Sequence, residues 1–135
     1  MNEGELTTVA KHQGSIVECL ERIAVPTVVV TLGHHGCCAR VRGLWVLQPA
    51  FPITPVDTTA AGDTFCGALV AALSQEIDMA QALRQASAAG ALACTRLGAQ
   101  SSIPASNEVA RFLAAQGPTS VDAIRSLRQF CGLPA

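Results

Sequence analysis

The stretch that determines the fold is Asp57-Thr58-Thr59-Ala60-Ala61-Gly62-Asp63-Thr64-Phe65-Cys66-Gly67. Small residues lie between its two acids, Asp57 and Asp63. This pattern predicts a tight turn followed by a helix, because the later apolar residues recur at the spacing of one helix face: Phe65, Ala68, Leu69, Ala72 and Leu73. The first amides of a helix lack intrahelical acceptors and lie at the positive end of its dipole. The stretch therefore predicts an anion site, and phosphate is the anion that suits it best.

Asp63 lies where its charge would repel a bound phosphate. The position has a chemical use if the carboxylate takes a proton from a hydroxyl group that then attacks phosphorus. Phosphoryl transfer needs such a base, donors for the moving charge and a metal ion. The alternative is structural: Asp63 stabilises the start of the helix, and Asp57 is a turn residue. The spacing alone leaves both interpretations open.

The composition suits one compact domain with an apolar core, because half of the 135 residues are hydrophobic. The net charge of −1 gives no electrostatic reason to expect nucleic acid or an anionic membrane as a partner. No apolar run approaches the ~20 residues of a membrane-spanning helix. The acidic N-terminus lacks the basic and apolar regions of a signal peptide. We therefore expect a cytoplasmic protein that binds neither nucleic acid nor membrane.

The six cysteines raise the question of disulfides or zinc. No Cys-x-x-Cys pair and no Cys/His cluster has zinc spacing. Four of the cysteines stand alone in apolar surroundings: Cys19, Cys66, Cys94 and Cys131. Buried free thiols are therefore expected. The pair His34-His35 has no further ligand beside it, so we expect it in a loop rather than at a metal.

Periodicity and capping residues predict an α/β chain. Ser15-x-x-Glu18 has the pattern of a capping box. Helices are expected over residues 2–10, 15–24, 62–75 and 79–96, around 109–113, and from Ser120 onward. Strands are expected over residues 27–32, 37–41 and 44–48, the first as a buried parallel strand and the others as a hairpin. So few strands predict an incomplete sheet, with part of a larger fold absent.

The stretch quoted first resembles the C-terminal signature of the ribokinase-like, PfkB-type carbohydrate kinases. The resemblance implies the C-terminal half of a ribokinase-like fold. It also implies that Asp63 is the catalytic base on a sugar hydroxyl, and that the backbone of Ala60, Ala61 and Gly62 forms an anion hole. The family often has glycine at the Ala60 position, so alanine there is a mild departure.

Two further segments resemble the nucleotide side of the same family. In Thr31-Leu32-Gly33-x-x-Gly36, the resemblance implies contacts of Thr31, Gly33 and Gly36 with ATP, although a plain turn is the alternative. In Asn2-x-x-Glu5, it implies that Asn2 touches the phosphates and that Glu5 acts through magnesium-bound water. An acidic, frayed terminus is the alternative there. Ser87 lies where the family lines its adenine pocket.

The run from Ala88 to Pro104 resembles the ribokinase branch of the family. By that likeness a potassium ion is enclosed by four main-chain carbonyls and two side chains: the carbonyls of Thr59, Ala93, Arg96 and Gly98, and the side chains of Asp57 and Ser102. The alternative is a helix C-cap at Gly98 followed by a polar loop.

The resemblance covers only the C-terminal half of a family member, so residues 1–116 are expected to be that portion of a kinase domain. Residues 117–135 form an extra helix without a family counterpart. The implied function is transfer of a phosphoryl group from ATP, with Mg2+ and K+, to a primary hydroxyl of ribose or a related small sugar. The alternative is a non-catalytic remnant or a nucleotide-binding half-module that needs a partner. Because the sugar-recognising half and its lid are missing, we expect little activity from this chain alone, and self-association through exposed apolar surface.

Overall fold

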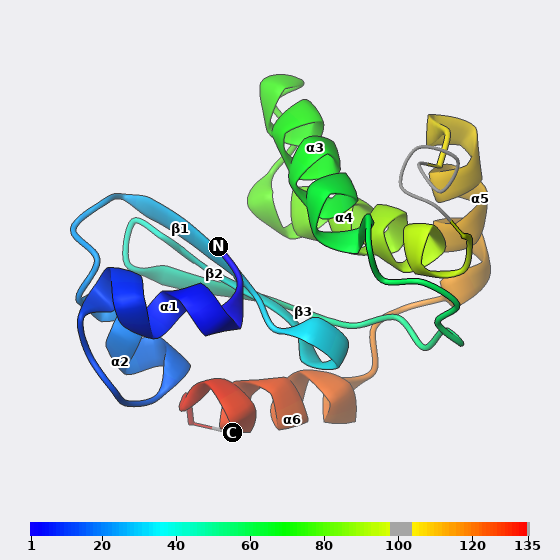
Figure 1. The fold of residues 1–135 in the computed structure, drawn as a ribbon. Helices are drawn as coiled ribbons and strands as arrows, with labels where there is room; N and C mark the ends of the chain where they lie inside the picture. The colour runs from blue at the N-terminus through cyan, green and yellow to red at the C-terminus, as the bar shows by residue number, and fades with distance from the viewer. Residues whose placement is uncertain (98–103, 135) are drawn as a thin grey trace. The chain divides into compact units, whose positions relative to one another are not determined.

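The structure is a computed structural model that describes residues 1–97 and 104–134. It divides into two compact units rather than the single domain expected from composition: the first unit is Met1–Pro49 with Thr119–Ala135, and the second is Ala50–Pro118. Figure 1 labels the elements of both units. The boundary expected at residue 116 separates the part that resembles the family from the rest of the chain, and the compact units do not test it. It stays a prediction.

The first unit contains a three-stranded sheet in the order β1-β2-β3. Its strands are β1 (Thr27–Thr31), β2 (Gly36–Val41) and β3 (Leu44–Pro49). Arg42 and Gly43 both have positive φ, as a two-residue hairpin turn between β2 and β3 requires. Both neighbouring pairs are antiparallel, so the parallel pairing expected for the first strand is wrong with respect to β2. The parallel partner of β1 among the described residues is an isolated bridge between Asn2 and Thr31.

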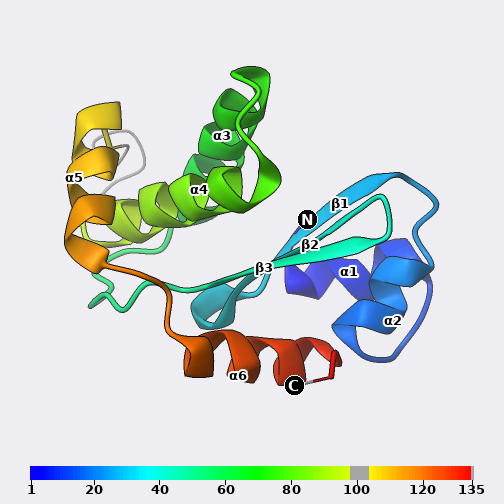
Figure 2. The ribbon, with the colours of Figure 1, turned by 180° about the vertical axis from the view of Figure 1, so that it is seen from behind.

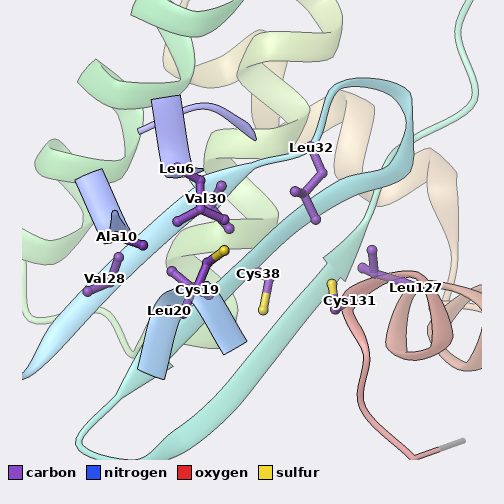
Figure 3. Packing of buried hydrophobic residues seen from close by; sticks show 10 residues of the cluster. All are labelled: Leu6, Ala10, Cys19, Leu20, Val28, Val30, Leu32, Cys38, Leu127 and Cys131. Atoms are coloured by element: carbon purple, nitrogen blue, oxygen red, sulfur yellow. The ribbon is translucent and has the colours of Figure 1, made fainter. Parts of the chain in front are cut away.

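Three helices pack on this sheet through one apolar core. They are α1 (Glu3–Ala10), α2 (Ile16–Glu21) and α6 (Val121–Cys131). Figure 3 shows their buried side chains with those of the sheet: Leu6, Ala10, Cys19, Leu20, Val28, Val30, Leu32, Cys38, Leu127 and Cys131. Since α6 contributes Leu127 and Cys131, the end of the chain belongs to the core that its beginning builds.

The end of α2 is set by Arg40 of β2. The guanidinium of Arg40 donates hydrogen bonds to the carbonyls of Leu20, Ile23 (2.7 Å) and Val25 (2.6 Å). These bonds satisfy carbonyls at the helix end, and α2 stops at Glu21, earlier than the expected residue 24. The expected capping box at its start is half formed. Ser15 Oγ accepts from the Glu18 amide (3.1 Å), but the Glu18 carboxylate lies 3.5 Å from His12.

The second unit consists of α3 (Ala61–Ser74), α4 (Met79–Cys94) and α5 (Ser106–Gln116), preceded by the extended segment after β3. Figure 2 shows α3 and α4 side by side, as does Figure 1. Small side chains let these helices approach closely. A Cβ added at Gly90 of α4 would lie 3.3 Å from the Ala61 carbonyl oxygen. The helix that starts at the signature turn is therefore packed against α4 at its first residues.

None of the six cysteines, which all lie among the described residues, forms a disulfide bond. Cys19, Cys37, Cys38 and Cys131 are buried as expected, but Cys66 is exposed, because it lies on the face of α3 that points away from the α3–α4 core. Among the described helices, none combines the length and apolar character that crossing a membrane requires.

Candidate functional site

The turn before α3 is held by its own hydrogen bonds. The Asp57 carboxylate accepts from the amide of Thr59 (2.9 Å) and from the Thr59 hydroxyl. The Ala61 amide donates to the Thr58 carbonyl (3.2 Å). These bonds form an Asx turn that leads directly into the helix. Asp57 therefore has the structural role considered as the alternative, whether or not it also binds a cation.

Two amides at the start of α3 remain available. Gly62 and Asp63 lie in the first helical turn, where no intrahelical acceptor exists, and no hydrogen bond from either amide to a described residue is formed. Gly62 is exposed, and a Cβ placed on it would meet nothing within 4 Å. In this structure the Ala61 amide serves the turn instead, so its role in an anion hole stays a prediction, as does that of Ala60.

Asp63 is exposed in the first turn of α3, and it takes part in none of the ion pairs between described residues. Its carboxylate is thus accessible to a ligand. A carboxylate in the first turn also stabilises the helix start, so the structural interpretation stays open beside the catalytic one. Its neighbour Thr64, which the sequence analysis did not single out, has a buried hydroxyl oxygen without a hydrogen-bond partner among the described residues. Only its place beside Asp63 could have drawn attention to it.

The segment before the turn is hydrogen-bonded to the end of α4. The amides of Val56 (2.7 Å) and Asp57 (3.0 Å) both donate to the Cys94 carbonyl. This contact joins the segment that carries Asp57 and Thr59 to the end of α4, next to Ala93 and Arg96 in the sequence. These are four of the residues expected around a potassium ion. Carbonyl and carboxylate oxygens are suitable ligands for a large monovalent cation. The two remaining members of the expected set, Gly98 and Ser102, lie outside the described residues.

Charged side chains surround this end of α4. The Arg96 guanidinium forms an ion pair with Glu108, and this hydrogen bond, with one from the Ala105 amide (3.1 Å), lowers the pKa of Glu108. Burial, followed by the nearby charge of Asp57, raises the pKa of the Cys94 thiol. Because the Arg96 side chain is already paired, its contribution to a cation site would come from its main chain.

In the first unit, Asn2 and Glu5 begin α1 with a complete capping box. The Glu5 amide donates to Asn2 Oδ1 (2.9 Å), and the Asn2 amide donates to Glu5 Oε1 (3.0 Å). The terminus is therefore capped rather than frayed. One carboxylate oxygen of Glu5 takes no part in the box, and oxygen is the donor that magnesium prefers. The bridge between Asn2 and Thr31 places this pair at the end of β1.

The predicted nucleotide turn follows β1 directly. Residues Gly33–His35 form a short 3-10 helix, closed by hydrogen bonds from the Leu32 amide to the Gly36 carbonyl (2.8 Å) and from the His35 amide to the Leu32 carbonyl (3.1 Å). His34 and His35 lie in this turn as expected, and no group of three metal-ligating side chains exists among the described residues. Ser87 lies half-buried on α4, in the second unit.

The chain is similar to known proteins of one family. A family model described as pfkB family carbohydrate kinase matches residues 1–106. Ribokinase from Haemophilus influenzae is 43% identical over 89 residues, which make up 66% of this chain and 29% of that protein. Fructokinase-1 from Zea mays is 33% identical over 115 residues, which make up 80% of this chain and 36% of that protein. The chain therefore spans roughly a third of the length of these relatives.

Solved structures of ribokinase-like proteins share the fold of this chain. The crystal structure of a putative ribokinase II from Escherichia coli, in complex with ATP and Mg2+, matches with a TM-score of 0.76 at 32% identity. The match covers 84% of this chain and 38% of that one. The expected fold class is confirmed: the chain has an α/β, ribokinase-like structure with an incomplete sheet.

Proposed function

Because this chain belongs to the pfkB family of carbohydrate kinases, we propose that it carries the phosphate-handling part of a sugar kinase. The reaction is transfer of the terminal phosphoryl group of ATP to a primary hydroxyl of ribose or a related sugar. The observation that carries the proposal is the start of α3, where an exposed carboxylate adjoins two amides that have no acceptor among the described residues. Relatives named ribokinase and fructokinase leave the choice of sugar open.

Asp63 acts on the acceptor in this proposal. Its carboxylate takes the proton from the sugar hydroxyl as the hydroxyl oxygen bonds to phosphorus, and the ADP oxygen leaves on the opposite side. The amides of Gly62 and Asp63 donate to the oxygens of the moving phosphoryl group. Fixed amide donors stabilise such charge well, because they need no reorganisation when the charge develops.

Metal ions have plausible ligands in both units. Glu5, with Asn2 beside it, would hold magnesium through water, and magnesium supplies charge neutralisation on the ATP phosphates. The oxygens of Asp57, Thr59, Ala93 and Arg96 would hold potassium beside the turn. The Asx turn that Asp57 already builds would then be fixed further, and with it the start of α3.

A half-module is the second candidate function, and the coverage of the relatives favours it. The chain spans 29% of one relative and 36% of another, and the resemblance implies that the sugar-recognising residues belong to the part of the family that this chain does not match. By this candidate the chain binds nucleotide or anion and needs a partner for catalysis. Without a closed site, water competes with the sugar and the acceptor is not positioned.

The test measures binding and turnover separately. Calorimetric titration of the full chain with ADP and magnesium tests the nucleotide site, and mass spectrometry of the sugar phosphate tests turnover with ATP, magnesium, potassium and either ribose or fructose. We expect nucleotide binding and slow product formation. In Asp63→Asn, product formation should fall by a factor of roughly 10² to 10⁴, the usual contribution of a general base, while nucleotide binding persists.

Each outcome supports or refutes a separate part of the proposal. Equal product formation by the wild-type chain and Asp63→Asn would refute the role of Asp63. Nucleotide binding without any product would favour the half-module. Absence of binding would refute the nucleotide site and both candidates with it.

A further inference from the structure

Three aromatic rings meet at the predicted nucleotide turn. The rings of His34 and His35 lie 4.1 Å apart, and Phe130 of α6 stacks on His35 at 3.8 Å with an interplanar angle of 16°. The sequence predicts no functional role for α6, and α6 lies outside residues 1–106, which the family model matches. The stack therefore joins a turn within the matched residues to a helix that lies beyond them.

The helix that carries Phe130 is itself fixed. Leu127 and Cys131 are buried in the core of the first unit, and the Cys38 thiol donates a hydrogen bond to Cys131. A Cβ added at Gly132 would lie 2.7 Å from Ser15 Cβ, so the end of α6 lies directly against the start of α2. Figure 3 shows Cys131 and Leu127 among the buried side chains of this core. Phe130, by contrast, keeps 38% of its surface exposed.

The 33–36 turn, which carries His35, begins and ends with a glycine of positive φ. Gly33 has φ of 58° and Gly36 has φ of 120°, and a Cβ on Gly33 would meet nothing within 4 Å. Glycine at these φ values gains no restraint from a side chain. Three backbone hydrogen bonds close the turn, from the amides of Leu32, His35 and Gly36. Leu32 anchors its start in the core, and the stack on Phe130 ties the His35 side chain to α6.

We propose that Phe130 is a positioning residue for nucleotide binding: its ring holds His35, and through it the backbone of the 33–36 turn, in the conformation that accepts a nucleotide. The proposal rests on the proposed function, because it assigns the turn the nucleotide role expected there. Phe130 acts through His35 and need not touch the nucleotide. An aromatic pair of this kind changes an equilibrium by a factor of roughly two to ten.

The experiment compares four variants of the full chain by calorimetric titration with ADP and magnesium. Phe130→Ala removes the ring, Phe130→Leu keeps apolar bulk without a ring, and Phe130→Tyr keeps the ring. Val121→Ala, at a site on α6 that is 71% exposed, is the matched control. We expect nucleotide affinity two- to tenfold weaker in the Ala and Leu variants, and unchanged in the Tyr variant and the control. The ring current of Phe130 should also displace the His35 proton resonances in every chain that keeps the ring, without nucleotide.

The outcomes separate this inference from the proposed function. If the wild-type chain binds ADP and Phe130→Leu binds it equally well, the inference is refuted and the proposed function stands. If the wild-type chain does not bind ADP, the nucleotide site fails and the inference falls with it. If circular dichroism shows that Phe130→Ala does not fold, the nucleotide affinities of Phe130→Leu and Phe130→Tyr still test whether the ring is required.

Discussion

Glu108 joins chain segments on either side of residues 98–103. Its carboxylate accepts from the Arg96 guanidinium and from the Ala105 amide, and these two hydrogen bonds lower its pKa. Arg96 belongs to the segment that is expected to bind potassium, so this ion pair restrains one side of that proposed site. The pair is partly exposed, with about a third of each side chain accessible, and water screens it accordingly.

Replacement of Glu108 by Gln should destabilise the chain at neutral pH. The folded-state pKa lies below the ordinary value of 4.5, so the carboxylate stabilises the fold above that value and loses this effect as the pH falls through the lowered pKa. The difference in unfolding midpoint between wild type and Glu108→Gln should therefore shrink between neutral pH and an acid pH well below 4.5. Urea denaturation at both pH values measures it.

Asp122→Asn is the matched control for this prediction. Asp122 pairs with Arg125 at 3.1 Å, but both side chains are mostly exposed. Exposed pairs of this type contribute at most about 1 kcal/mol, so the control should shift the midpoint little at either pH. A Glu108→Gln deficit that stays constant down to acid pH would refute the ion pair as its cause.

Local features of single residues were predictable, and contacts between distant residues were not. Ser15 and Ser120 cap α2 and α6 as expected, because a cap depends on residues three positions apart. The three carbonyls held by Arg40 and the stack of His35 on Phe130 depend on segments far apart in the chain. No periodicity records such contacts. The approach of Asp57 to the end of α4 was expected only through the family resemblance.

At the scale of elements, the direction of β1 shows what a hydrophobic pattern leaves undetermined. The apolar, β-branched run of residues 27–32 indicated a strand, and residues 27–31 form one. Burial does not reveal the partner, however, and the hairpin that follows pairs with β1 in the antiparallel sense. Helix boundaries were within a few residues of those expected, except where Arg40 ends α2 early.

The space available for a side chain differs between the glycines of α3 and α4. A Cβ at Gly67 of α3 would meet nothing within 4 Å, whereas one at Gly90 of α4 would lie 3.3 Å from the Ala61 carbonyl oxygen. Alanine in a helix interior is favoured over glycine by about 1 kcal/mol. Gly67→Ala should therefore raise the free energy of unfolding by up to about that amount. Gly90→Ala should gain less, because the new methyl group pushes on the first turn of α3.

Urea denaturation followed by circular dichroism compares these two variants, and Gly90→Val extends the series. Valine at this position adds further volume to a packed interface, which typically costs about 1–3 kcal/mol. Equal stabilisation by Gly67→Ala and Gly90→Ala would show that the helices separate easily there. The start of α3, which carries Asp63, would then be less firmly held than the structure indicates.

At the scale of the whole molecule, the core of the first unit is notable for its thiols. Cys19, Cys37, Cys38 and Cys131 are each at most 1% exposed, whereas Cys66 of α3 is exposed. The hydrogen bond to Cys131, with burial, raises the pKa of the Cys38 thiol. Alkylation requires the thiolate and access to it, so the six thiols should react in an order that reports the fold.

We expect iodoacetamide to modify Cys66 first, and Cys38 only when the first unit unfolds. Raising the pH from about 7 to 9 speeds the alkylation of an ordinary accessible thiol. Cys38 stays protonated because its pKa is raised, so its slow reaction should not accelerate in proportion. Peptide mass spectrometry after timed labelling measures each site, and Cys66→Ser removes the fast phase as a control. Rapid labelling of Cys38 or Cys131 in the native chain would mean that α6 leaves the sheet readily, and Phe130 could then not hold the turn at His35.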